Sequence, residues 1–205
     1  MDNIFDRYSK EYDDWYEKNK FAYLSELEAI KKVMPDKGRG LEIGVGSGRF
    51  ASALGIDIGI DSSPQMIEKA RKRGLKVKLA QGENLPFNDG EFDYVLIITT
   101  LCFVREPRKV IAEASRVLKN RGRLIVGIID KNSSLGKRYQ TKKSRFYKKA
   151  KFFLVNEVVN LLKEAGLGKI SLKQTLFHPP DELSQIEPSQ DGDGKGAFVV
   201  ISACK

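Results

Sequence analysis

One stretch decides the fold that we expect: Leu41-Glu42-Ile43-Gly44-Val45-Gly46-Ser47-Gly48. It begins as an apolar strand that carries one acid, and it then passes through glycines at alternate positions into a brief helix over 47–54. Glycine allows positive φ and a close approach of the backbone to a ligand. Dinucleotide sites and ordinary tight turns share this pattern, so the stretch predicts a β-α unit and leaves the ligand open.

Outward from this turn, short apolar runs alternate with helical stretches, a pattern typical of parallel strands joined by crossover helices. We expect strands at 41–45, 56–60, 75–79, 92–99 and 124–129, and helices from Ser62 or Ser63 to Gly74, over 107–118 and from Asn156 to Gly166. The last strands, 169–176 and 197–204, have no helical pattern between them and should pair antiparallel. The predicted fold class is α/β, a mostly parallel sheet with an antiparallel C-terminal hairpin and helices on both faces.

Composition limits the class of protein. The 205 residues are 41% hydrophobic and 31% charged, and the longest apolar run, Tyr94 to Ile98, is far shorter than a membrane span. Asp2 and Asp6 stand where a signal peptide would carry cations, so we expect a cytoplasmic protein. Two cysteines and one histidine exclude a disulfide framework and a usual zinc site, and we expect no metal.

The net charge of +9 is concentrated in one segment. Residues 131–151 hold nine Lys or Arg and no acid, whereas the other 27 basic groups balance 27 acidic ones. Aromatic residues are interleaved with these cations and follow them, at Tyr139, Phe146, Tyr147, Phe152 and Phe153. Such a segment is typical of binding to an acidic substrate or an RNA backbone, and also of a solvated connector.

Asp61 gives the second indication of a ligand. It ends a strand in Gly59-Ile60-Asp61-Ser62-Ser63-Pro64, where a carboxylate can accept both hydroxyls of a ribose. An ordinary helix N-cap is the alternative role. The dinucleotide fingerprint requires glycine at its first, third and sixth positions, and the sixth position from Gly44 is Arg49, which disfavours NAD.

Several segments in order carry a family resemblance: 42–48, 59–66, Glu83-Asn84-Leu85-Pro86-Phe87, Phe92-Asp93-Tyr94-Val95 and 116–124. They resemble the motifs of class I S-adenosylmethionine-dependent methyltransferases, of the branch that acts on small molecules, over residues 38–130. The resemblance implies a Rossmann-like sheet of seven strands. Residues 1–34 have apolar side chains at helical spacing. We therefore expect 1–37 to be an N-terminal helical cap or lid and 38–205 to be the methyltransferase domain, with a single domain overall.

The resemblance also implies the residues that bind the cofactor, S-adenosylmethionine: Glu42, Gly44, Gly46, Gly48, Asp61, Gln81, Gly82 and Thr99. The glycines of the turn would pass beneath the methionine and ribose, and Glu42 would lie near the amino group. Asp61 would hold the ribose hydroxyls, Gln81 and Gly82 would lie at the adenine, and Thr99 would close the pocket. The expected site offers two acids, Glu42 and Asp61, and the glycine turn carries no lysine. Such a charge distribution suits a cofactor with a cationic sulfonium and no phosphate. The sequence departs from the family at Gln81, often an acid, and at Asn120-Arg121, commonly Pro-Gly.

The predicted reaction is a direct displacement on the methyl group by a small-molecule acceptor, which needs alignment and exclusion of water more than a dedicated nucleophile. Phe103, two residues after Leu101, favours an apolar or aromatic wall for the acceptor. If the acceptor must lose a proton, His178, at the start of the loop after 169–176, is our candidate general base; its alternative is a surface or packing role. Competing functions are methyl transfer to RNA or protein through 131–151, a non-catalytic cofactor-binding module and, less favoured, a dehydrogenase.

Overall fold

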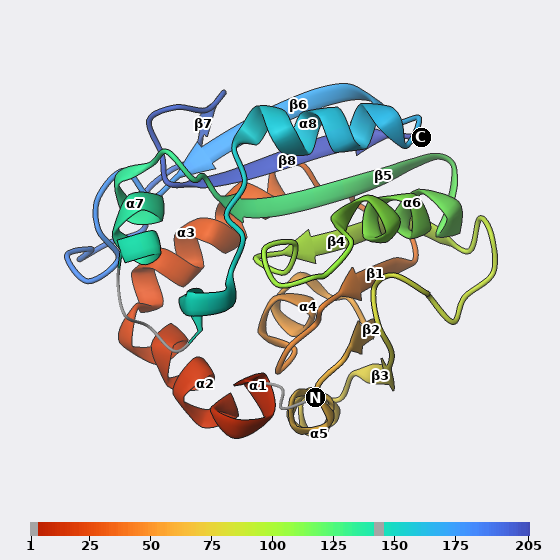
Figure 1. Ribbon diagram of the computed structural model, residues 1–205, viewed down its shortest axis with the longest axis horizontal. Helices are drawn as coiled ribbons and strands as arrows, with labels where there is room; N and C mark the ends of the chain where they lie inside the picture. The colour runs from red at the N-terminus through yellow and green to blue at the C-terminus, as the bar shows by residue number, and fades with distance from the viewer. Residues whose placement is uncertain (1–3, 142–145) are drawn as a thin grey trace.

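The computed structural model describes residues 4–141 and 146–205, and one mixed β-sheet forms its centre (Figure 1). Within these residues the sheet has eight strands in the order β3-β2-β1-β4-β5-β8-β6-β7. In chain order they are β1 (Gly40–Ile43), β2 (Ile58–Asp61), β3 (Lys76–Leu79), β4 (Phe92–Ile98), β5 (Leu118–Ile129), β6 (Gly168–Thr175), β7 (Gln190–Asp191) and β8 (Phe198–Cys204). Strands β1 to β5 are parallel, and β8 is antiparallel to both β5 and β6.

This arrangement confirms the predicted α/β class with its antiparallel C-terminal hairpin. The structure adds one strand to the expected seven, because β7 pairs with β6 through Lys173 and Gln174. β7 is only two residues long and lies within a polar loop, so it leaves no alternating pattern in the sequence.

Helices cover both faces of the sheet (Figure 1). α6 (Pro107–Val117) and α8 (Val155–Glu164) pack on one face, and α3 (Lys20–Lys31), α4 (Arg49–Leu54) and α5 (Pro64–Lys72) pack on the other. Successive strand residues point to opposite faces, so Leu96 and Ile97 of β4 belong to two separate apolar clusters. The buried sheet therefore holds its strand ends in fixed positions.

Some boundaries differ from those predicted. The N-terminal helical stretch is broken at Tyr8 and Asn19 into α1 (Ile4–Arg7), α2 (Ser9–Lys18) and α3. The sequence predicts Asn156 as the N-cap of α8, but the N-cap is Leu154, two residues earlier, and the Leu154 N–H donates to the Glu157 carboxylate at 2.7 Å. β5 begins at Leu118, which pairs with Phe92 ahead of an irregularity in the register.

The parallel strands end on the side of the molecule where α2 and α7 (Ser134–Thr141) lie (Figure 1). The short helix η1 (Tyr147–Lys149) follows α7 along the chain. Three cations of the basic segment, Lys142, Lys143 and Arg145, lie outside the described residues. Over the described ranges, no helix combines the length and apolar character needed to cross a bilayer.

Candidate active site

A first cavity of about 580 Å³ lies at the carboxyl ends of the parallel strands. Six of the predicted cofactor residues line it: Gly44, Gly46, Asp61, Gln81, Gly82 and Thr99. They follow or end different strands, and the parallel topology brings them to one edge of the sheet. The structure therefore assembles most of the predicted set in one place.

Asp61 fastens the glycine turn to the start of α5. Its Oδ2 accepts a hydrogen bond from the Gly46 N–H and its Oδ1 accepts one from the Ser63 N–H, each at 2.8 Å. Burial raises the pKa of Asp61, and these bonds oppose that increase. A carboxylate has about four acceptor positions, so both oxygens retain capacity for a ligand. The N-cap of α5 is Ser63, whose Oγ accepts from the Met66 N–H at 3.2 Å, and not Asp61.

The glycines of the turn have different functions. Gly44 has φ +73°, and a Cβ there would lie 2.2 Å from the Thr100 side chain, so only glycine lets the turn pack against the end of β4. A Cβ on Gly46 would project toward Tyr12, whose nearest atom is 3.7 Å away. Gly48 is the N-cap of α4 and does not line the cavity; a Cβ there would meet the Leu75 side chain at 2.5 Å. Gly48 therefore supports the turn from outside the cavity.

Glu42 lies on β1 and is 1% exposed. Its Oε2 has no hydrogen-bond partner among the described residues, and burial raises the pKa of the carboxyl to about 8. A buried polar atom without a partner is destabilising, and native proteins rarely keep one without a reason. Glu42 does not itself line the first cavity. Burial raises the pKa of Tyr12, which does line it, and the charges of Asp61 and Glu42 add to the increase.

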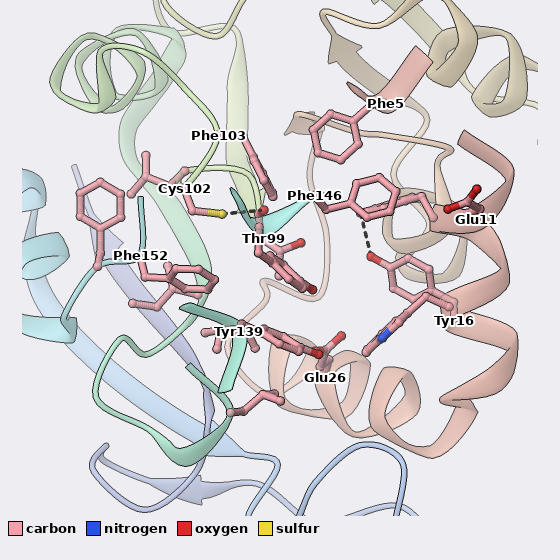
Figure 2. Close-up of a pocket in the computed structure, with 18 residues that line it drawn as sticks. Phe5, Glu11, Tyr16, Glu26, Thr99, Cys102, Phe103, Tyr139, Phe146 and Phe152 are labelled. Atoms are coloured by element: carbon pink, nitrogen blue, oxygen red, sulfur yellow. Dashed lines mark hydrogen bonds between the residues drawn. The ribbon is translucent and has the colours of Figure 1, made fainter. Parts of the chain in front are cut away.

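A second cavity, of about 170 Å³, has an aromatic lining (Figure 2). Its walls come from α2, α3, the ends of β4 and β5, α7 and η1. Four residues line both cavities: Phe5, Tyr12, Thr99 and Phe103. The two cavities therefore meet at one boundary, and Phe103 forms part of the apolar wall that was predicted there.

Thr99 stands at this boundary in an uncommon conformation. Its φ is +49°, a region that β-branched residues rarely adopt, and its N–H donates to the Gly127 carbonyl at 2.8 Å. Such a backbone costs about 1–3 kcal/mol, and residues of this kind cluster at functional sites. The twist ends β4 and directs Thr99 toward both cavities.

Glu26 is the residue of the second cavity that the sequence analysis missed. It is 3% exposed and makes no hydrogen bond or ion pair with any described residue, and burial raises its pKa to about 8. A signal was present in the sequence, because Glu26 stands three or four positions from Ala22, Ala29 and Ile30. An acid at helical spacing within an apolar stripe lies on the buried face of a helix.

The basic segment separates its aromatic residues from its cations. The aromatic residues within this segment and directly after it line the second cavity: Tyr139, Phe146, Tyr147, Phe152 and Phe153. The described cations are exposed on the surface: Lys131, Lys137, Arg138, Lys148, Lys149 and Lys151. The segment therefore forms a cavity wall with a basic outer surface.

The structure does not bring His178 to these cavities. Its side chain is 71% exposed, contacts the Glu187 carboxylate through Nδ1, and lines neither cavity. Cys102 does line the second cavity, where burial raises the pKa of its thiol to about 12. Because the thiolate is the nucleophilic form, Cys102 is unsuited to covalent catalysis.

The N-terminal helices are fastened over the glycine turn. Asp13 of α2 accepts hydrogen bonds from the Ser47 hydroxyl at 2.6 Å and from Arg49 Nε at 2.8 Å. Asp6 of α1 accepts a bond from the Ser63 hydroxyl at 2.5 Å. These contacts hold α1 and α2 beside both cavities.

Comparison with known proteins agrees with this geometry. A family model described as a methyltransferase domain matches residues 41–126. The chain is 52% identical to an uncharacterized protein of Methanocaldococcus jannaschii, with 99% of both chains covered. The crystal structure of a Thermotoga maritima protein, described as a SAM-dependent methyltransferase and possible histamine N-methyltransferase, has a TM-score of 0.96 at 50% identity, with 98% of both chains covered. A demethylmenaquinone methyltransferase of the same organism is 33% identical over 60% of this chain and 58% of its own.

The chain belongs to the class I S-adenosylmethionine-dependent methyltransferases, and its cofactor is S-adenosylmethionine. The expected family, fold and enzymatic activity are confirmed. The residues present also fit this cofactor. Asp6, Asp61 and Glu83 outnumber Arg105, the one cation among the described lining residues, and Glu42 keeps an unsatisfied oxygen beneath the turn. An acidic site suits a sulfonium, whereas a phosphate would favour cations.

Proposed function

We propose that the enzyme transfers the methyl group of S-adenosylmethionine to a small organic molecule held in the aromatic cavity. The boundary shared by the two cavities, at Tyr12, Thr99 and Phe103, carries this proposal. A cofactor in the first cavity and an acceptor in the second would meet there. S-adenosylmethionine supplies an electrophilic methyl group on a cationic sulfur, and the protein contributes alignment and the exclusion of water.

Within this proposal, each predicted cofactor residue has a specific part. Asp61 accepts the ribose hydroxyls, because the Gly46 and Ser63 amides already fix its carboxylate. Glu42 accepts a hydrogen bond from the amino group of the cofactor through Oε2, which has no partner among the described residues. Gly44 and Gly46 lie beneath the methionine and ribose, Gln81 and Gly82 at the adenine, and Thr99 at the boundary, as the resemblance implies, whereas Gly48 supports the turn from outside the cavity.

The lining of the aromatic cavity favours a small acceptor. Tyr16, Tyr139 and Phe152, which line it, are each less than 8% exposed, so a macromolecule would have to displace its cover to reach the boundary. We assign that cover to α1 and α2, as the lid expected for residues 1–37. Histamine and demethylmenaquinone, named for two relatives, are both small organic molecules.

A labelling experiment tests this function. The enzyme is incubated with S-adenosylmethionine that carries a labelled methyl group, in parallel with a metabolite extract, total RNA and total protein. We expect label in the low-mass fraction, and label confined to RNA or protein would contradict the proposal. RNA as acceptor would also give binding that weakens steeply as salt increases, because exposed cations such as Lys148 and Lys151 would contact phosphates.

A further inference from the structure

One wall of the aromatic cavity carries a buried carboxyl group that has no hydrogen-bond or ion-pair partner among the described residues. Glu26 extends from α3 into the cavity and lies next to Tyr139, on the opposite side from Phe5 and Phe103 (Figure 2). A buried charge without a partner is strongly unfavourable, and proteins normally pair it or bind a ligand to it. Glu26 therefore indicates what the cavity receives.

The rest of the lining lacks a positive charge. Among the described lining residues the ionisable groups are Glu11, Glu26, Cys102 and several tyrosines, with no Lys, Arg or His. Burial raises the pKa values of Tyr16 and Tyr139, and the negative charge of an ionised Glu26 adds to both increases. Aromatic rings attract ammonium groups through their faces, and a desolvated carboxylate forms strong charge-assisted hydrogen bonds with them. This combination is suited to a cationic amine.

We infer that the methyl acceptor is a small amine with an aromatic or otherwise apolar body, and that Glu26 binds its ammonium group. The inference rests on the proposed function, because it concerns the occupant of the same cavity. An apolar cavity of roughly 150 Å³ is known to admit benzene, so a volume of about 170 Å³ suits one ring with a short side chain. An ammonium group at Glu26 would place the other end of the acceptor toward Thr99 and Phe103, where the cofactor cavity begins. Glu26 would therefore orient the acceptor so that a nucleophilic N, O or S atom at the far end from the ammonium faces the cofactor. That atom would form the new bond to the methyl carbon as the sulfur–methyl bond breaks, S-adenosylhomocysteine would leave, and any proton on the acceptor atom would pass to water.

The test measures binding and uses two matched probes. 2-Phenylethylamine carries the cation, and 2-phenylethanol has nearly the same shape without charge. The single tryptophan, Trp15, lines the cavity, so its fluorescence reports occupancy in the presence of saturating S-adenosylhomocysteine. The variant is Glu26→Gln, and the control is Glu28→Gln on the same helix, where the carboxylate is partly exposed and paired with Lys32.

We expect the wild type and Glu28→Gln to bind the amine more tightly than the alcohol. Glu26→Gln should lose roughly 10- to 100-fold in amine affinity, the range for a lost charged hydrogen bond, and should keep its affinity for the alcohol. Retained alcohol binding also shows that the variant is folded. The inference is overturned if the wild type does not prefer the amine, if neither probe binds, or if Glu26→Gln keeps the preference.

A second measurement separates this inference from the proposed function. Low-mass products from the labelling experiment are passed over a cation-exchange resin. We expect the labelled product to be retained as a cation. A labelled small molecule that is not retained would overturn the amine assignment and leave the proposed function intact, whereas label confined to macromolecules would overturn the proposed function itself.

Discussion

The buried Glu26 carboxyl should make the stability of the free enzyme depend on pH. Its pKa is about 8 in the folded chain, against an ordinary value of 4.5, because burial disfavours the charged form. Below the ordinary value the carboxyl is protonated in both the folded and unfolded chains, and it has no effect on stability. As pH increases from there to about 8, the unfolded chain loses the proton and the folded chain keeps it, so the free energy of unfolding decreases.

The magnitude follows from the two pKa values. Each pH unit in that interval costs at most about 1.4 kcal/mol, so an increase from about pH 5 to about pH 8.5 removes up to roughly 4 kcal/mol. Water that enters the cavity lowers this figure, and we expect roughly 2–4 kcal/mol. The titratable groups that face Glu26, Tyr16 and Tyr139, have raised pKa values and stay neutral throughout this range.

Urea unfolding of the wild type, Glu26→Gln and Glu28→Gln at these two pH values measures the effect. The glutamine variant cannot ionise, so it should be more stable relative to the wild type at the higher pH than at the lower one, by the amount given above. Glu28→Gln should follow the wild type. Equal pH dependence of wild type and Glu26→Gln would refute the argument, because Glu26 would then titrate like a solvated carboxyl.

Three further substitutions test other parts of the structure. Asp61→Asn should weaken S-adenosylhomocysteine binding roughly 10- to 100-fold in calorimetry, because an amide cannot accept from both backbone N–H groups; unchanged affinity would place the ribose elsewhere. Burial alone would raise the pKa of Asp13, but hydrogen bonds from Ser47 and Arg49 outweigh it and lower the pKa to about 2. This stabilisation is present above pH 3.8 and is lost as pH falls through about 2. Asp13→Asn should therefore lower the urea midpoint at neutral pH, by about 1 kcal/mol in stability; an unchanged midpoint would contradict a stabilising role for the hydrogen bonds of Asp13 with Ser47 and Arg49. His178→Ala should leave the rate of labelled methyl transfer unchanged, because the side chain is exposed outside both cavities; a large loss of rate would support the general base expected from the sequence.

The sheet and the first cavity are predictable from the sequence because their signals are local. The glycine turn and Asp61 each follow an apolar strand, and parallel topology brings such strand ends together. His178 also follows a strand, and the same rule suggested that it would reach the site. However, β6 is separated from β4 by β5 and β8, so the loop after β6 leads His178 to the surface. The rule that strand ends meet at one edge predicts proximity only for neighbouring strands. Which strands are neighbours depends on long-range pairing, which local sequence patterns do not reveal.

The aromatic cavity was harder to predict, because several separate segments build it. Tyr16 and Glu26 come from the N-terminal helices, whereas Tyr139 and Tyr147 come from the segment after β5. Each group contains aromatic side chains at spacings that also suit ordinary packing. Only tertiary contact shows that the two groups face one another, as where Tyr12 of α2 lies against Phe146 with ring centroids 6.1 Å apart.

The two cavities are lined by different parts of the chain, and this difference has an evolutionary consequence. In the proposed function the cofactor would lie against loops at the ends of the strands, whereas most of the described residues that line the acceptor cavity come from two stretches, 5–26 and 135–153. Mutations in these two stretches should therefore change which acceptor is methylated and leave the residues of the cofactor site unchanged. Exchange of both stretches between homologues should transfer the preference for a methyl acceptor. Exchange of one stretch alone should give a cavity whose two walls do not fit the same acceptor.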